Sequence, residues 1–266
     1  MDYQQEIDKI VKEEINNISR WMKEYQEDSG TNGFVLGCSG GLDSSVCLSI
    51  LKRSIPIENI IAVALPCNSN EDSLIDARKL TDNLGIRLEV INLENSFNSV
   101  LENLKSINTD SEEISNLVKG NISARLRMVQ LYSIANQHNY LVLGTSNKSE
   151  LMCGYGTKYG DLAIDCDIIG SYYKTQVYEM AKLMPEIPQS ILDKAPSADL
   201  WPGQKDQDDL YFDYPTLDKI LQRWESDNKK YIDYKDGITE EDFNRVSNMI
   251  KKAYHKNNMP PTCPRL

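Results

Sequence analysis

Four short apolar runs alternate with longer helix-like segments up to residue 145, and this alternation constrains the fold more than any other feature. The runs cover residues 33–38, 60–65, 87–93 and 140–145. IIAVAL at 60–65 is too uniformly apolar to alternate between a wet and a dry face, as expected for a strand covered on both faces. Strands and helices in alternation, with short connections, predict a doubly wound, mainly parallel α/β sheet.

The segments between these runs have the apolar spacing of helices. Residues 3–28 carry apolar side chains at helical intervals from Ile7 to Met22. Further helices are expected over residues 43–53, 70–84, 94–106 and 112–137. After residue 150 the pattern thins into loops rich in Gly, Asp and Tyr, followed by short helices. We therefore expect a single domain over residues 1–266 with a helical C-terminal portion.

The charge balance argues against nucleic acid as a partner. The sequence has 29 basic and 40 acidic side chains and a formal net charge of −11. A general nucleic-acid binder needs a surplus of Lys and Arg on one face, so no nucleic-acid partner is expected. A local basic pocket for a small anionic ligand remains compatible with this balance.

Hydropathy and cysteine usage indicate the compartment. No apolar run approaches the length of a membrane span, and the N-terminal segment MDYQQEIDKIVKEE is charged throughout. The six cysteines form no C-x-x-C pair and have no metal-ligand spacing. We interpret them as reduced thiols that mostly pack in the interior, which is typical of a cytoplasmic protein with no membrane partner.

The segment LGCSGGLDSSV, residues 36–46, lies where the first predicted strand ends and a helix begins. One interpretation is a turn that needs flexible, capping residues; the other is a loop whose N–H groups face a phosphate. Ligands bind at this edge of an open α/β sheet, and a helix N-terminus attracts anions. Glycines let the backbone approach closely, serines add hydroxyl donors, and Asp43 can hold a cation that bridges phosphate oxygens. The Lys of the Walker loop is missing, yet the position between strand and helix favours a phosphate.

Several motifs together resemble one family. S-G-G-x-D-S after a strand resembles the signature of the ATP pyrophosphatases, which cleave ATP between the α- and β-phosphates. Within that superfamily the chain resembles the NAD synthetases from about residue 30 to the C-terminus. The motifs that carry this resemblance are GNISARLRMVQLYSIANQ (120–137), LVLGTSNKSELMCGYGTKYGD (141–161), YKTQVYEMA (173–181), PSADLWPGQKDQDDL (196–210) and HK (255–256).

The resemblance implies a two-step amidation. The carboxylate of deamido-NAD attacks the α-phosphorus of ATP to give an adenylated intermediate and pyrophosphate, and ammonia then releases NAD and AMP. Glutamine-dependent members carry an extra glutaminase domain, for which 266 residues leave no room, so free ammonia is the expected donor unless a separate glutaminase chain supplies it. The protein's expected contributions are charge neutralisation, alignment and exclusion of water.

The resemblance also implies an ATP site and a metal site. Asp43 and Glu150, at the ends of strands expected to be close in the sheet, are placed to share Mg²⁺. Lys174 would neutralise charge on the leaving pyrophosphate. By spacing alone, Lys174 would be an ordinary surface lysine and Glu150 a solvated helix residue. The expected ATP-binding residues are Gly37, Cys38, Ser39, Gly40, Gly41, Leu42, Asp43, Ser44, Thr145, Lys174 and Ser197.

The second substrate and the ammonia step implicate further residues. Tyr155 can stack on the pyridine ring or simply pack. Because ammonium is not nucleophilic, a carboxylate near the site of attack would help as base. Asp161 is the candidate, and an Asp that caps the next helix is the alternative; the adjacent Leu162 replaces a glycine found in many family members. The expected deamido-NAD-binding residues are Arg125, Tyr155, Lys158, Asp165, His255 and Lys256.

Two larger-scale expectations follow. The family resemblance implies a homodimer with the deamido-NAD site near the subunit boundary. The predicted 112–137 helix has an apolar face that fits either dimer packing or core burial, formed by Ile114, Leu117, Val118, Ile122, Leu126 and Val129. Residues 196–210 mix Pro, Gly and acidic residues around Trp201, which is typical of a lid ordered by substrate.

Two alternative functions remain to be weighed against this one. Another ATP pyrophosphatase, such as a tRNA-thiolating enzyme, would need a basic surface and often reactive or metal-binding cysteines. A nucleotide-binding sensor without turnover would leave Lys174, Asp161 and Glu150 free to decay, yet all three positions carry competent residues. We therefore expect an active ligase that forms a C–N bond.

Overall fold

One parallel sheet organises the protein. The computed structural model describes residues 3–67, 70–107, 113–201, 203–232 and 235–264. Among these residues, five strands pair in parallel in the order β3-β2-β1-β4-β5, which confirms the predicted doubly wound α/β fold. The strands are β1 (Gly33–Gly37), β2 (Ile60–Ala64), β3 (Leu88–Val90), β4 (Tyr140–Gly144) and β5 (Cys166–Asp167).

The three central strands coincide with the predicted apolar runs, whereas the two edge strands do not. The run at 87–93 contributes only Leu88–Val90 to the sheet, where β3 is an edge strand that pairs with β2. Its remainder stays close, with Ile91 N–H donating to Ala64 O at 3.0 Å. β5 was not predicted, since two residues are too few for a periodic pattern.

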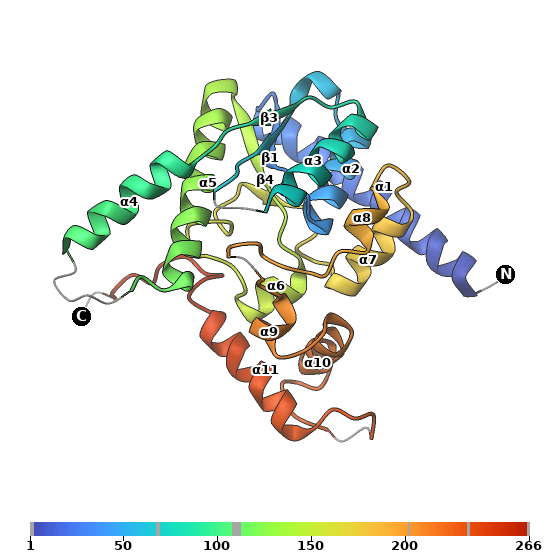
Figure 1. Ribbon diagram of the computed structural model, residues 1–266. Coiled ribbons are helices and arrows are strands. Elements are labelled where there is room, and N and C mark those ends of the chain that lie inside the picture. The colour runs from blue at the N-terminus through green and yellow to red at the C-terminus, as the bar shows by residue number, and fades with distance from the viewer. Residues whose placement is uncertain (1–2, 68–69, 108–112, 202, 233–234, 265–266) are drawn as a thin grey trace.

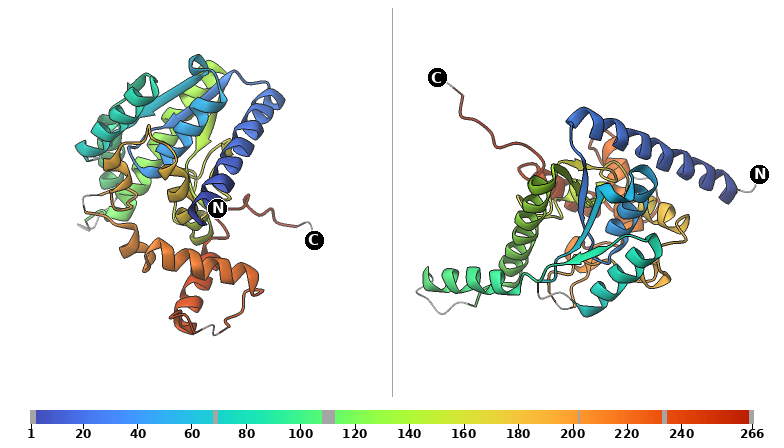
Figure 2. Two further views of the ribbon diagram at one scale, coloured as in Figure 1. Left: turned by 90° about the vertical axis from the view of Figure 1, so that its right-hand side faces the viewer. Right: turned by 90° about the horizontal axis from the view of Figure 1, so that it is seen from above.

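Alternate residues of β1 enter two different cores, which explains why this strand is apolar throughout. Phe34 and Leu36 are fully buried among residues of α1, α2, α3, α7 and α8. Val35, also fully buried, packs with residues of α4 and α5. Figure 1 and the two views of Figure 2 show α1 on one side of the sheet and α4 and α5 on the other. These helices are α1 (Tyr3–Ser29), α2 (Leu42–Ser54), α3 (Glu71–Leu84), α4 (Glu94–Ile107), α5 (Asn116–His138), α7 (Lys174–Lys182) and α8 (Gln189–Leu192).

The helices match their predicted ranges closely, with one correction. The helix expected over 112–137 begins at Asn116, because the Ser115 side chain accepts a hydrogen bond from Val118 N–H at 3.4 Å and caps it. Residue 112 lies outside the described residues. The apolar face expected there is divided: Ile122 and Leu126 pack against the core, while Leu117 and Val129 are exposed.

The C-terminal portion is helical, as predicted, and has a core of its own. Leu217 and Ile220 of α10 pack with Phe243 and Val246 of α11, and all four are buried. This group of helices packs on α6, as the lower part of Figure 1 shows. The remaining elements are η1 (Ile57–Asn59), α6 (Lys148–Cys153), α9 (Asp206–Leu210), α10 (Tyr214–Ser226) and α11 (Glu240–Ala253).

Two physical properties bear on the expected compartment. Among the described helices, none combines the length and the apolar character that crossing a membrane requires. Five of the six cysteines are buried free thiols and Cys263 is exposed. The interpretation of most cysteines as packing residues is therefore confirmed.

Candidate active site

A cavity of about 660 Å³ lies at the carboxyl edge of the sheet. Its walls come from the loop after β1, the ends of β2 and β4, one side of α5, and the segment 194–206. This volume falls in the range of pockets that bind nucleotide-sized ligands. Most of the residues expected for ATP line this cavity: Gly37, Cys38, Ser39, Gly41, Leu42, Asp43, Ser44, Thr145, Lys174 and Ser197.

The loop between β1 and α2, residues 37–44, has the geometry of an anion cradle. No described side chain caps α2, whose N-cap is Gly41, so the first-turn N–H groups remain available to a ligand. The Ser44 hydroxyl donates to Gly41 O at 3.1 Å and lies 3.1 Å from the Ser39 hydroxyl, which accepts from Gly41 N–H at 3.2 Å. These bonds fix two hydroxyl groups at the mouth of the loop.

Gly40 is the expected ATP residue that does not line the cavity, and its role is steric. Its φ of +75° lies in the left-handed region. A Cβ atom there would lie 2.0 Å from Ser73 O of α3, so only glycine fits. The loop is therefore pressed against the start of α3.

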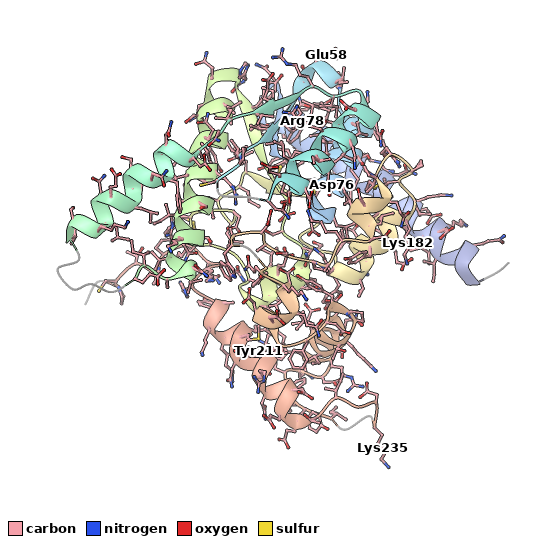
Figure 3. All side chains as sticks on the ribbon, viewed as in Figure 1. Glu58, Asp76, Arg78, Lys182, Tyr211 and Lys235 are labelled. Carbon is pink, nitrogen blue, oxygen red and sulfur yellow. The ribbon has the colours of Figure 1, made fainter. Side chains whose placement is uncertain are left out.

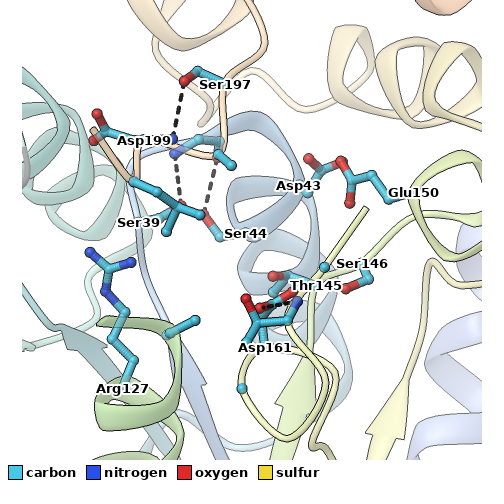
Figure 4. A pocket seen from close by; sticks show the side chains of 18 of the residues that line it. Ser39, Asp43, Ser44, Arg127, Thr145, Ser146, Glu150, Asp161, Ser197 and Asp199 are labelled. Atoms are coloured by element: carbon cyan, nitrogen blue, oxygen red, sulfur yellow. Dashed lines mark hydrogen bonds between the residues drawn. The ribbon is translucent and has the colours of Figure 1, made fainter. Parts of the chain in front are cut away.

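Three charged side chains from α2, α6 and α7 meet inside the cavity. The Lys174 ammonium forms an ion pair with Asp43 and lies 3.5 Å from Glu150 Oε1. Figure 4 shows the side chains of Asp43 and Glu150 side by side. Asn147 positions both carboxylates: its Nδ2 donates to Asp43 Oδ1 at 3.3 Å, and its backbone N–H donates to Glu150 Oε2 at 3.3 Å.

The charges in this cluster perturb one another. Burial raises the pKa of Glu150, and the nearby Lys174 ammonium opposes that shift. Burial lowers the pKa of Lys174, but Asp43 and Glu150 outweigh it, so the pKa of Lys174 is raised overall and the ammonium stays charged. Lys174 is only 3% exposed, which corrects the spacing-based picture of a surface lysine. Glu150 is likewise no solvated helix residue.

The same two carboxylates suit a hard divalent cation. Among the described residues, no group of three or more His, Cys, Asp or Glu side chains could hold a metal ion. Mg²⁺, however, is commonly held by one or two carboxylates plus substrate phosphates and water. Asp43 and Glu150 already attract one cation, the Lys174 ammonium, beside the phosphate loop. The donor set therefore fits Mg²⁺ bound together with a nucleotide.

Asp161 lines the other side of the cavity. Its Oδ1 accepts a hydrogen bond from Thr157 N–H at 2.9 Å within the same loop, so it does not cap the next helix. Asp161 is an exposed residue of the cavity wall. Removal from bulk water nevertheless raises the pKa of its carboxyl, and the hydrogen bonds from Thr157 oppose that shift. A carboxylate with a raised pKa is a better proton acceptor.

An unpredicted network joins the segment 194–206 to the site. The Tyr155 hydroxyl donates to Asp206 Oδ1 at 3.0 Å or Asp209 Oδ2 at 2.9 Å. The Tyr214 hydroxyl lies 2.8 Å from Asp206 Oδ2 and 3.3 Å from Glu150 Oε1. Asp206 is 3% exposed, and burial raises its pKa. The Tyr155 hydroxyl is thus hydrogen-bonded to carboxylates, while the Tyr155 ring packs beside the C-terminal core.

Four residues expected to bind deamido-NAD lie outside the lining of the cavity. Arg125 donates from Nε and Nη2 to Lys158 O at 3.3 Å, and Lys158 Nζ donates to His255 O. These three basic residues thus form one cluster. Lys256 does line the cavity and donates to Gly154 O at 2.7 Å and Gly156 O at 2.8 Å.

Asp165 lies apart from that cluster. Its Oδ2 accepts from Val142 N–H at 2.8 Å, and its Oδ1 accepts from the Tyr132 hydroxyl at 3.1 Å. Its carbonyl oxygen accepts from the Tyr25 hydroxyl at 3.0 Å. In this chain Asp165 therefore fixes the start of β5 against β4 and α1.

Arg127 was not among the expected site residues, yet it lines the cavity. Its Nε donates to Leu65 O at 3.1 Å at the end of β2, and burial lowers its pKa. Ala124, Arg127 and Leu131 are spaced by three and four residues along α5 and all line the cavity. Arg125, two positions before Arg127, lies on a different side of α5 and does not line the cavity. The helical spacing relative to Ala124 is the signal that would have found Arg127.

The chain is similar to one family over nearly its whole length. The model of the NAD synthase family matches residues 14–260. The NH3-dependent NAD+ synthetase of Methanocaldococcus jannaschii is 37% identical over 258 residues, which cover 95% of this chain and 96% of that protein. The NMN synthetase structure from Francisella tularensis has a TM-score of 0.83 and 32% identity, covering 95% of this chain and 98% of that one. The NH3-dependent NAD synthetase structure from Campylobacter jejuni has a TM-score of 0.78 and 29% identity, covering 96% and 99%.

Proposed function

Because this chain belongs to the NAD synthase family, we propose that its cavity is where it amidates deamido-NAD to NAD with ATP and ammonia, releasing AMP and pyrophosphate. The observation that carries this proposal is the joint placement of the phosphate loop, the carboxylates of Asp43 and Glu150, and Lys174 around one cavity of about 660 Å³. A ligase that splits ATP at the α-phosphate needs such a combination of anion cradle and cations.

The first step forms a mixed anhydride. One carboxylate oxygen of deamido-NAD bonds to the α-phosphorus of ATP, and the bond from that phosphorus to the bridging oxygen of pyrophosphate breaks. The loop N–H groups and the hydroxyls of Ser39 and Ser44 hold the departing phosphates. The buried Lys174 ammonium neutralises the charge that builds on them, and it does so at full charge because its pKa is raised.

Asp43 and Glu150 are the residues that would hold Mg²⁺. When bound, this ion supplies charge neutralisation for the phosphate oxygens. Lys174 now occupies the position between the two carboxylates. Lys174 and the loop line the same cavity, and we propose that its ammonium contacts phosphates seated on the loop.

The second step joins nitrogen to the activated carbonyl carbon. Ammonia attacks that carbon, the bond to the AMP oxygen breaks, and a proton leaves the nitrogen. We propose Asp161 as the acceptor of this proton, because it lies in the cavity with a raised pKa and is held by Thr157. We propose that Arg125, Lys158 and Lys256 supply positive charge for the deamido-NAD pyrophosphate and that His255, beside Lys158, is a further contact for this substrate.

The proposal extends to assembly and cellular context. Val118 and Val129 of α5 are 40% and 56% exposed and, eleven residues apart, share one side of the helix, and we propose that they pack across a homodimer interface. We further propose that residues 1–266 act as one synthetase domain supplied with ammonia. The cytoplasm suits its five buried, unoxidised thiols.

A second candidate substrate deserves a direct comparison. The structural similarity to the Francisella tularensis enzyme, with a TM-score of 0.83, favours nicotinate mononucleotide as an alternative acceptor. It carries the same carboxylate on the same ring and lacks only the adenylate half. The chemistry inside the cavity would be identical for both acceptors.

Product analysis tests both candidates. The protein is incubated with ATP, Mg²⁺ and ammonium at mildly alkaline pH, with deamido-NAD in one sample and nicotinate mononucleotide in another. We expect NAD and AMP in equal amounts, with a higher kcat/KM for deamido-NAD, and loss of both products in Asp43→Ala. ATP binding without AMP formation from either acceptor would contradict the proposal and favour a nucleotide sensor.

A further inference from the structure

Lys194 lines the same cavity as the phosphate loop but has no role in the mechanism described so far. It precedes Ser197 on the segment after α8. Its Nζ donates to the Ser73 hydroxyl of α3 at 2.9 Å. About a third of the side chain, 32%, is exposed, so the ammonium can meet a ligand that enters the cavity.

Ser73 places this ammonium next to the phosphate loop. The backbone of Ser73 lies directly against Gly40, because a Cβ on Gly40 would come within 2.0 Å of Ser73 O. The side chain of the same residue receives the hydrogen bond from Lys194. Ser73 therefore contacts both Lys194 Nζ and the phosphate loop. Lys194 reaches the loop from the α3 side, whereas Lys174 reaches it from the side of Asp43 and Glu150.

The charge of Lys194 is only partly balanced by its protein neighbours. Asp76 Oδ2 is 3.8 Å from Lys194 Nζ, too far for a hydrogen bond, and Asp76 Oδ1 accepts from the Ser190 hydroxyl at 2.7 Å. Figure 3 labels Asp76 on α3. An ammonium group has three N–H donors, and the hydrogen bond to Ser73 uses one of them. The other two are suited to phosphate oxygens.

Ser73 also ties down the segment that carries Lys194. Its hydroxyl donates to Asp199 Oδ2 at 2.9 Å, and Asp199 N–H donates to the Ser197 hydroxyl at 3.0 Å, as Figure 4 shows for the latter bond. Lys194, Ser197 and Asp199 are thus held on one short segment against α3. This arrangement fixes where a cation can sit relative to the loop.

We propose that Lys194 is a second phosphate-binding cation of this site, which contacts the β- and γ-phosphates of ATP and the pyrophosphate product. Ser73 is its positioning residue. The inference rests on the proposed function, because it assigns the terminal phosphates to the loop beside Gly40. The ligand class is a linear polyphosphate with at least two phosphates, so AMP does not engage Lys194.

Calorimetric titrations of the whole protein with pyrophosphate and with AMP, in buffer with Mg²⁺, test this assignment. Lys194→Met should bind pyrophosphate about tenfold more weakly, as expected for one partly exposed charge-assisted contact, and AMP within about twofold of the wild type. Lys194→Arg should retain most of the pyrophosphate affinity. Ser73→Ala should lower it by about threefold, because the charge remains but its position is less fixed.

Lys182→Met is the matched control. Lys182 lies on α7, labelled in Figure 3, is 59% exposed in its side chain, pairs with Glu179 and does not line the cavity. It should bind pyrophosphate and AMP as the wild type does. Equal pyrophosphate affinity in Lys194→Met and Lys182→Met would overturn the inference, and so would a parallel loss of AMP affinity in Lys194→Met. The result is independent of turnover: a protein that makes no NAD can still show Lys194-dependent binding of pyrophosphate.

Discussion

Substitution of Gly40 by alanine should destabilise the protein far more than the same change at its neighbour Gly41. At Gly40, φ is +75° and the new Cβ would lie 2.0 Å from Ser73 O and 3.2 Å from Ala77 N. A left-handed non-glycine residue costs about 1 kcal/mol, and forcing two backbone segments apart costs about 1–3 kcal/mol more. We therefore expect the free energy of unfolding to fall by about 2–4 kcal/mol.

Gly41 provides the control within the same loop. Its φ is −93°, which alanine adopts without strain, and its new Cβ would lie 3.3 Å from the flexible Ser39 hydroxyl. Gly41→Ala should lower the free energy of unfolding by less than about 1 kcal/mol. Urea denaturation followed by circular dichroism measures both variants. If Gly40→Ala were as stable as Gly41→Ala, the close packing of the loop on α3 would be refuted.

Three further perturbations probe pH dependence, the lid and assembly. Burial raises the pKa of Asp167 to about 7, and its Oδ2 is buried without a hydrogen-bond partner. The unfolded chain therefore loses this proton at a lower pH than the folded protein does, so the free energy of unfolding falls between about pH 4 and 7. Asp167→Asn should lessen that fall when denaturation is measured at pH 5 and 7.5, and an unchanged fall would refute this assignment. Tyr155→Phe removes the hydroxyl that is hydrogen-bonded to Asp206 and Asp209, so limited proteolysis within 196–210 should be faster than in the wild type. ATP together with deamido-NAD should slow this cleavage. A cleavage rate that changes neither with the substitution nor with the substrates would argue against a lid. Val129→Glu places a charge on an apolar position that is 56% exposed, and sedimentation velocity should then show monomers, whereas an unchanged dimer would exclude this face of α5 as the interface.

The strands at the centre of the sheet could be predicted from sequence because both of their faces are buried. Phe34 and Leu36 enter one core and Val35 the other, which makes every position apolar. β5 could not be predicted, since Cys166–Asp167 is too short to carry a pattern and is defined by pairing with β4. The loop after β1 was predictable because the segment SGGLDSS lies between a strand and a helix, although the contact of Gly40 with Ser73 could not be predicted from this local pattern.

Residues whose roles depend on tertiary placement were harder to find. Lys174 had no signal in its spacing, and its burial between Asp43 and Glu150 depends on how α7 packs beside α2. Arg125 was predicted as a site residue and Arg127 was not. Of these two arginines, however, Arg127 is the one on the cavity-facing side of α5 with Ala124. A motif identifies the neighbourhood of a site, and the helix phase decides which member of the motif enters it.

The transfer of a carboxylate oxygen to AMP tests the central claim most directly. Deamido-NAD labelled with ¹⁸O in the nicotinate carboxylate is turned over with ATP, Mg²⁺ and ammonium, and the products are analysed by mass spectrometry. Attack of that carboxylate on the α-phosphorus predicts one ¹⁸O atom in each AMP and none in pyrophosphate. Unlabelled AMP, or label in pyrophosphate, would contradict an adenylated intermediate formed in this cavity.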